Sequence, residues 1–323
     1  MQGLGIFCGF TTAILMACSY IASGWAIRRT PELNALTLLA CSFIWMGLVC
    51  VVGLAFTWRP EILQGFWHRF PPVVASLSCY TLAQILMFAA QRKVDASLLV
   101  PLLGLKLPIL MFLNIAFLGS SFTWLQVFAV ALTVVAAFLL NRTGKGLVFS
   151  SLCYVLLACV FFSLSDMSLK QETDLLINEL GFSPTLAAAY CTYLNYLTAG
   201  IFGAVVIAFN RRIRTRRAML HSLPYGLLWI VSIIFLNICF AILGTVNGNI
   251  IQSTRGIFAI LFAPILVACG LTYLEQKVSV GTIARRLLAA GLMVGAIFLY
   301  NFRQGSSHTP PTVSPLNTES ISQ

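Results

Sequence analysis

Residues 33–57 read LNALTLLACSFIWMGLVCVVGLAFT and contain no charged side chain. A helix needs about 20 apolar residues to cross the hydrocarbon of a bilayer, so this stretch is long enough to span it. Nine further apolar runs fill the chain to residue 302, separated by short polar or basic hinges. The ten runs cover approximately 3–27, 33–57, 71–91, 96–118, 122–141, 147–165, 183–209, 223–243, 249–273 and 283–302.

The runs are continuous rather than alternating, which predicts helices and not the strands of a barrel. The composition agrees, because 59% of the residues are hydrophobic and 9% are charged, whereas a soluble domain carries about a quarter charged residues. We therefore predict an all-α polytopic membrane protein with ten transmembrane helices and no room for a separate soluble domain. The six tryptophans lie mostly near the ends of the runs, as expected for aromatic belts.

The net charge of +11 does not predict a nucleic-acid partner, because most basic residues lie in the hinges between runs. Basic hinges mark the cytoplasmic side of a membrane protein. The side opposite the N-terminus receives Arg28, Arg29 and the cluster Arg211–Arg217. The polar segment 166–182, which we expect to form a loop, falls on the other side. The charge pattern therefore predicts that both termini lie outside the cytoplasm and that the bilayer is the main partner.

The sequence contains no recognisable catalytic or metal-binding motif. It has no H-E-x-x-H, no G-x-S-x-G and no phosphate loop. The ten cysteines are scattered within the apolar runs without metal-ligand or C-x-x-C spacing. We expect no enzyme, no cofactor and no metal.

The fourth and ninth runs continue into similar segments. Residues 108–119 read PILMFLNIAFLG, and residues 264–275 read PILVACGLTYLE. Each copy closes a set of five runs, and because five is odd the second set must enter the membrane upside down, as in many secondary transporters. We predict inverted five-helix repeats over 1–146 and 147–302, followed by a disordered polar tail over 303–323. A chance match between two apolar helices is the alternative.

With these features the chain resembles the drug/metabolite transporter (DMT) superfamily of the EamA type. The family typically has a proline-bearing helix, a glutamate at the next hinge and a glycine-rich last helix, which correspond here to Pro264, Glu275, Gly281, Gly291 and Gly295. The first half departs from this pattern at Gly119, where the glutamate would stand. The resemblance covers nearly the whole chain and implies ten helices in two inverted halves, but it names no substrate. Members often keep their termini in the cytoplasm, against the charge pattern.

Lys106 lies near the middle of the fourth run, where a lysine costs about 2.5–3.5 kcal/mol on insertion scales. Pro101 and Pro108 flank it, and each frees a backbone carbonyl of the helix. Broken helices at the midplane are where transporters bind substrate. The alternative is a structural ion pair with Asp166, an acid near a span of the other half.

Arg255 is the second charge within an apolar run. Gln252 shares its helical face, and Asn249 and Gly256 flank that face. If Lys106 and Arg255 face one cavity, the site favours an anionic group, to which arginine offers a bidentate contact. The alternative is that Arg255 extends to the membrane surface.

Tyr80 and Gln84 share one face of the third run and could bind a ligand or join two helices. We therefore expect substrate binding by Lys106, Arg255, Gln252, Gln84, Asn249 and Tyr80, and helix breaks or gating at Pro101, Pro108, Pro264 and Gly256.

The sequence predicts a secondary active transporter in the cell (inner) membrane that moves a small organic metabolite, anionic or zwitterionic, by alternating access. One alternative is an exporter of cationic drugs or toxic metabolites, which needs a carboxylate at the centre of the membrane, and the sequence offers none at mid-span. The other is a membrane-embedded protein that does not transport. The chain could act alone or as a homodimer.

Overall fold

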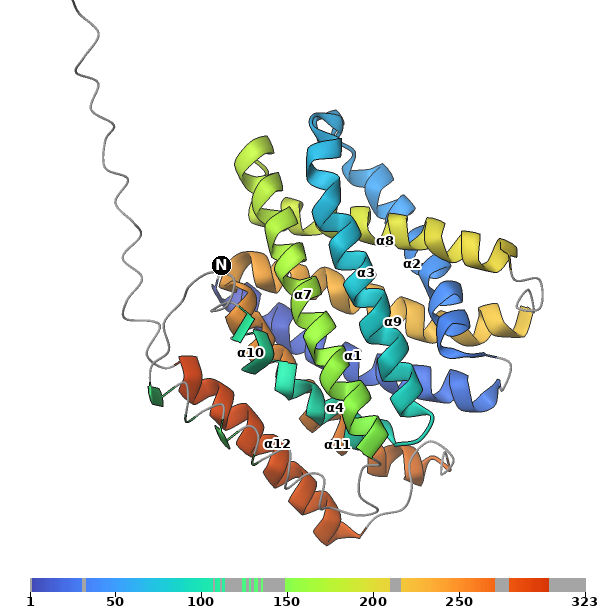
Figure 1. The fold of residues 1–323 in the computed structure, drawn as a ribbon, viewed down its shortest axis with the longest axis vertical. Helices are drawn as coiled ribbons and strands as arrows, with labels where there is room; N and C mark the ends of the chain where they lie inside the picture. The colour runs from blue at the N-terminus through green and yellow to red at the C-terminus, as the bar shows by residue number, and fades with distance from the viewer. Residues whose placement is uncertain are drawn as a thin grey trace, which may run out of the picture.

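The computed structural model describes most of the chain, and all regular structure in the described residues is helical. These are residues 2–30, 33–106, 108–110, 112, 113, 124, 125, 128, 131, 132, 135, 149–209, 216–270 and 279–301. The helices, shown in Figure 1, are α1 (Gln2–Arg29), α2 (Ala35–Thr57), α3 (Phe66–Gln91), α4 (Ala96–Leu102), α7 (Phe149–Leu180), α8 (Pro184–Phe209), α9 (Arg216–Leu243), α10 (Thr245–Ser253), α11 (Arg255–Ala268) and α12 (Val280–Asn301). Two short 3₁₀ helices, Pro60–Leu63 and Leu103–Leu105, lie before α3 and after α4.

Seven helices of the described chain are long and apolar enough to cross a membrane. They are α1, α2, α3, α7, α8, α9 and the stretch Asn247–Ala268, which contains most of α10 and all of α11. The protein is thus an all-α, multi-pass membrane protein, as predicted. The fifth predicted run and the tail 303–323 fall largely or wholly outside the described residues.

Several helices are longer than their apolar runs, and the difference is largest for α7 and α9. α7 continues to Leu180, so the expectation that 166–182 forms a loop is wrong for nearly all of that segment. α9 begins at Arg216 rather than at residue 223. Hydropathy marks where a helix leaves the hydrocarbon, whereas the polar extension of α7 is held by contacts such as the Lys170–Asp174 pair one turn apart. Gly181, with φ of 64°, then allows the chain to leave the helix.

Three pairs of helices make the most extensive contacts: α3 with α7, α2 with α8, and α1 with α9. α3 and α7 lie side by side and antiparallel (Figure 1). Two hydrogen bonds show the direction: Ser76 contacts Ser165, whereas Arg69, earlier in α3, contacts Glu179, later in α7. Between the helices lies one large core of aromatic and aliphatic side chains.

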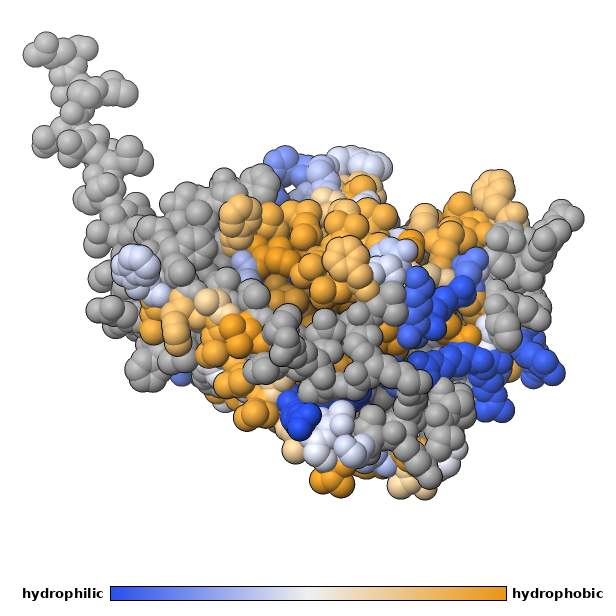
Figure 2. Space-filling model, turned by 60° about the horizontal axis from the view of Figure 1, so that its bottom comes forward, coloured by the Kyte–Doolittle hydropathy of each residue, from blue (hydrophilic) through white to orange (hydrophobic). Residues whose placement is uncertain are grey.

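The outer surface is strongly apolar. Figure 2 shows hydrophobic residues over most of the visible described surface, with strongly hydrophilic ones gathered mainly at one side. Phe56 and Ile201 are 86% and 68% exposed. Such surface is stable only against lipid, which agrees with a membrane protein.

α2 and α8 cross at two glycines. A Cβ atom built on Gly47 would lie 3.0 Å from the Cα of Gly200, and one built on Gly200 would lie 3.1 Å from the Cα of Gly47. The backbones therefore touch directly, which small residues permit between transmembrane helices.

The helices in the fourth and ninth predicted runs are interrupted, and they pack against each other. α4 ends at Leu102 and passes into the 3₁₀ turn Leu103–Leu105, while Thr254 separates α10 from α11. At their contact a Cβ atom built on Gly256 would lie 2.6 Å from the Cα of Pro101. The two breaks therefore lie at the centre of the bundle, where they position charged side chains.

Candidate functional site

A cavity with about 560 Å³ of space between protein atoms, including its open part, lies at the centre of the helices. α1, α3, α7, α8, α9, α10 and α11 contribute side chains to its wall, and Lys106 contributes from the turn after α4. Its lining combines three charged groups with serine, amide and aromatic side chains. A few convergent polar groups in an otherwise apolar pocket are typical of a small-molecule site.

Lys106 and Asp166 form a buried ion pair in this cavity. The lysine Nζ lies 2.5 Å from the Asp166 Oδ2, and the two residues are 4% and 5% exposed. Asn249 donates a second hydrogen bond of 2.8 Å to the same oxygen. The Ser163 hydroxyl donates to the Lys106 backbone carbonyl at 3.2 Å, which ties α7 to the helix break. Lys106 is therefore paired with Asp166, as in the structural alternative, and it lines the cavity as well.

Arg255 is the first residue of α11 and is 4% exposed. Its Nη1 lies 3.4 Å from the sulfur of Met16, a weak acceptor, and its Nε has no hydrogen-bond partner. Gln252 donates to the same sulfur at 3.1 Å. Among the described residues no carboxylate lies within ion-pair distance of the guanidinium. The cavity thus contains a buried cation with unused donors.

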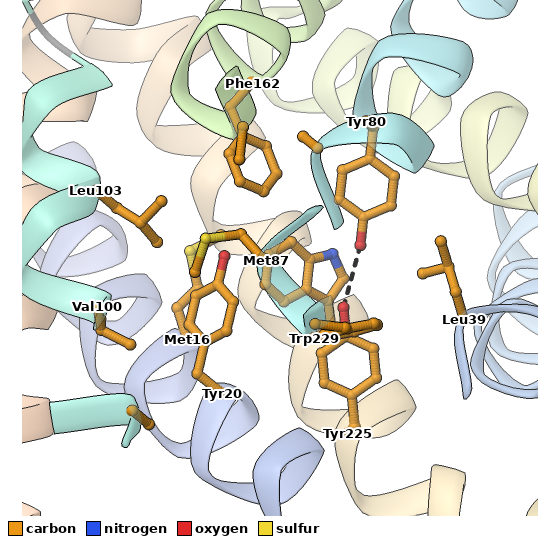
Figure 3. Packing of buried hydrophobic residues seen from close by; sticks show 14 of the residues in the cluster. Met16, Tyr20, Leu39, Tyr80, Met87, Val100, Leu103, Phe162, Tyr225 and Trp229 are labelled. Atoms are coloured by element: carbon orange, nitrogen blue, oxygen red, sulfur yellow. Dashed lines mark hydrogen bonds between the residues drawn. The ribbon is translucent and has the colours of Figure 1, made fainter. Parts of the chain in front are cut away.

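Aromatic side chains form one wall of the cavity. Figure 3 shows how Tyr80, Phe162 and Trp229 of this wall pack with other buried hydrophobic residues. The rings of Tyr80 and Trp229 are 5.6 Å apart, the Trp229 indole donates to the Tyr196 hydroxyl at 2.8 Å, and the hydroxyls of Tyr80 and Tyr225 are 3.4 Å apart. Phe162 places its ring 5.8 Å from the Lys106 ammonium. This wall supplies flat apolar surfaces beside the charged groups.

The cavity includes four of the residues expected to bind substrate: Lys106, Arg255, Gln252 and Tyr80. Gln84 lies behind the wall, fully buried, and donates to the Tyr80 hydroxyl at 3.3 Å. Asn249 holds Asp166 and does not line the cavity. These two residues support the lining from outside.

The residues expected at helix breaks lie in different surroundings. Pro101 and Gly256 meet at the contact between α4 and α11. Pro108 is half-buried, and Pro264 lies on the exposed side of α11. Glu275 lies outside the described residues.

The sequence analysis missed several residues of the site. Trp229 is 2% exposed and faces the cavity, so the belt interpretation is wrong for it. Because α9 begins at Arg216, Trp229 lies in the middle of the helix rather than near its end. Asn195 also lines the cavity, and a lone amide within the apolar run 183–209 was a signal that could have found it.

Comparisons with known proteins agree with this architecture. Residues 3–142 match the EamA-like transporter family. Of the solved structures, 28 chains resemble this one. One of them, titled "Crystal structure of protein", has a TM-score of 0.56 and 13% sequence identity over 92% of this chain and 99% of that chain. At this identity the likeness shows the fold alone. No curated protein matches the sequence.

Proposed function

We propose, from the membership of this chain in the EamA-like transporter family of the DMT superfamily, that it is a secondary active transporter of a small organic metabolite. The proposed mechanism is alternating access of the central cavity to the two sides of the membrane. The cell (inner) membrane is the proposed location.

The charges of the cavity support an anionic or zwitterionic substrate. Two cations, Lys106 and Arg255, face one carboxylate, Asp166, which leaves one net positive charge. The charges of Lys106 and Asp166 neutralise each other in their ion pair. Arg255 has no such partner in the described part of the chain, and its Nε makes no hydrogen bond there. The Arg255 guanidinium, which has no carboxylate partner among the described residues and whose Nε has no hydrogen-bond partner, is the observation that carries the proposal. A substrate carboxylate can accept two parallel hydrogen bonds from such a group.

A zwitterion fits the remaining surfaces. The faces of Tyr80 and Trp229 line the cavity and offer cation–π stabilisation to a substrate ammonium group without displacing Lys106 from Asp166. A substrate with one positive and one negative group also matches a cavity that is lined by both positive and negative side chains. This favours a zwitterion over an anion with several negative charges.

The pattern of helix contacts supports the inverted repeat proposed for 1–146 and 147–302. In chain order α1 corresponds to α7, α2 to α8 and α3 to α9, while α4 and the turn after it correspond to the interrupted helix α10–α11. A two-fold axis that exchanges the halves converts the α3–α7 contact into the α9–α1 contact, and both are among the most extensive. It leaves the pairs α2–α8 and α4–α11 in place, and both of these pairs are in contact.

The crossing of α2 and α8 has the same symmetry. The next nearest atom to a Cβ on Gly47 is the Tyr196 carbonyl oxygen at 3.3 Å, and for Gly200 it is the Phe43 carbonyl oxygen at 3.3 Å. Each oxygen belongs to the residue four positions before the opposing glycine. Such reciprocal contacts are what an axis through this crossing produces.

One observation favours the alternative of a cation exporter. Asp166 places a carboxylate in the cavity, although in the sequence it lies at the end of an apolar run rather than at mid-span. That carboxylate is engaged by Lys106 and Asn249, so an organic cation would have to displace the lysine. For this reason it is the second candidate.

Thermal unfolding of the purified protein tests the proposal, because a ligand that binds only the folded state raises the melting temperature. The panel contains neutral amino acids, mono- and dicarboxylates, phosphate and tetraphenylphosphonium. We expect zwitterions or carboxylates to raise the melting temperature of the wild type and of Arg216→Gln, an exposed control, but not of Arg255→Gln. Stabilisation by tetraphenylphosphonium that is lost in Asp166→Asn would favour the cation exporter instead.

A further inference from the structure

A second buried acid lies close to the cavity and has no part in the site described above. Glu172 is on α7, six residues after Asp166, or about 9 Å further along the helix axis. It is 0% exposed. Its Oε2 accepts a hydrogen bond of 2.5 Å from the Asn195 amide of α8, and its Oε1 has no hydrogen-bond partner.

Among the residues that the structure describes, no cationic side chain is paired with Glu172. The charged groups on the helices packed around it are engaged elsewhere in the pairs Lys106–Asp166, Lys170–Asp174 and Arg69–Glu179. The titratable neighbour on α8 is Cys191, a neutral thiol that donates to the Leu169 carbonyl. An unpaired carboxylate in such surroundings costs far more free energy than the neutral acid. The protonated form of Glu172 is therefore the form that the packed structure favours.

Asn195 connects this acid to the cavity. Its amide nitrogen donates both to Glu172 and, at 2.9 Å, to the Cys191 carbonyl, and this orientation leaves its own Oδ1 buried without a partner. Asn195 is also part of the cavity wall, as is Leu169 one turn before Glu172. The side chain thus contacts Glu172 on one side and the cavity on the other.

We infer that Glu172 is a proton-binding site that takes up and releases its proton through the central cavity, with Asn195 as the connection. A water molecule that moves from the cavity toward Glu172 can donate hydrogen bonds to two buried oxygens that have no other partner among the described residues. These are the Asn195 Oδ1 and the Glu172 Oε1. Use of this proton to drive transport rests on the proposed function, whereas the proton-binding site itself does not.

Infrared difference spectroscopy of the purified protein tests the site without any substrate. The wild type at neutral pH should show the carbonyl band of a protonated carboxylic acid, and Glu172→Gln should lack it. Glu179→Gln is the matched control on the same helix, because Glu179 is partly exposed and paired with Arg69; this variant should keep the band. A band that persists in Glu172→Gln overturns the assignment.

The route is tested by the rate at which this band shifts after transfer to deuterated water. Asn195→Leu keeps the size of the side chain but removes the polar connection, so exchange should slow about tenfold or more and the band should move because a hydrogen bond is lost. This variant keeps Glu172 and gives a result even if Glu172→Gln does not fold. An unchanged exchange rate would mean that the proton reaches Glu172 by another path and would overturn the cavity route. Because no ligand is added, the result is distinguishable from a failure of the ligand panel.

Discussion

At the scale of single residues, the pairing of Lys106 with Asp166 changes what removal of the lysine should do. An isolated charge in the membrane is a cost that truncation relieves, whereas the loss of one partner of a buried pair leaves the other uncompensated. The second case applies here, since the two side chains are in contact and almost fully buried.

We therefore predict that Lys106→Ala lowers the free energy of unfolding by about 3–5 kcal/mol, as for other broken buried ion pairs. The double variant Lys106→Ala with Asp166→Asn should recover much of that loss, because no unpaired charge remains. Thermal or denaturant unfolding in detergent measures both. If the single variant is as stable as the wild type, the pair contributes nothing to the fold and the lysine serves the ligand alone.

The sequence predicted part of this site for a clear physical reason. A charge such as Lys106 or Arg255 in an apolar run is conspicuous because the bilayer makes it costly. Glu172 and Asn195 escaped notice because hydropathy placed the glutamate in a loop and because single amides often join helices. The register that brings Asn195 to Glu172 depends on how α7 packs on α8, and that packing is not visible in one sequence.

At the scale of helices, hydropathy predicted which segments are helical but not where the helices end. The end of α7 is set by polar contacts and by Gly181, beyond the apolar residues that the pattern detects. The prolines do not mark the breaks themselves, because Pro101 lies inside α4 and Pro264 lies inside α11. The turn Leu103–Leu105 lies between Pro101 and Pro108, and Thr254 lies two residues before Gly256.

The contact between the two broken helices gives a prediction of its own. In Gly256→Ala the new methyl group would lie 2.6 Å from the Pro101 backbone, so α4 and α11 must separate. We expect a loss of about 1–3 kcal/mol in the free energy of unfolding, as for other overpacked sites.

Gly24→Ala in α1 is the matched control, since nothing lies within 4 Å of a Cβ atom there. Alanine forms helices better than glycine by about 0.5–1 kcal/mol, so this variant should be neutral or more stable. Melting temperatures of the two variants should therefore change in opposite directions. Equal changes in the two melting temperatures would show that α4 and α11 can separate to admit the methyl group without a loss of stability.

At the scale of the whole molecule, orientation in the membrane follows from the basic hinges. We predict that both termini lie outside the cytoplasm and that the start of α9, with Arg216 and Arg217, lies inside it. Alkaline phosphatase, which is active only outside the cytoplasm, should be active when fused after residue 302. Green fluorescent protein, which folds in the cytoplasm, should be dark at the same position; fluorescence there would reverse the assignment.

The glycine crossing of α2 and α8 has a mechanical consequence. Most helix pairs interlock through side chains, so a change in their angle forces rotamers to rearrange. Where Gly47 meets Gly200 there are no side chains to interlock, and two smooth backbones bear on each other. The angle between α2 and α8 can therefore change at this point without a rearrangement of side-chain rotamers. A crossing of this kind can serve as a pivot between the two halves of the bundle, with the largest displacements at the ends of the helices.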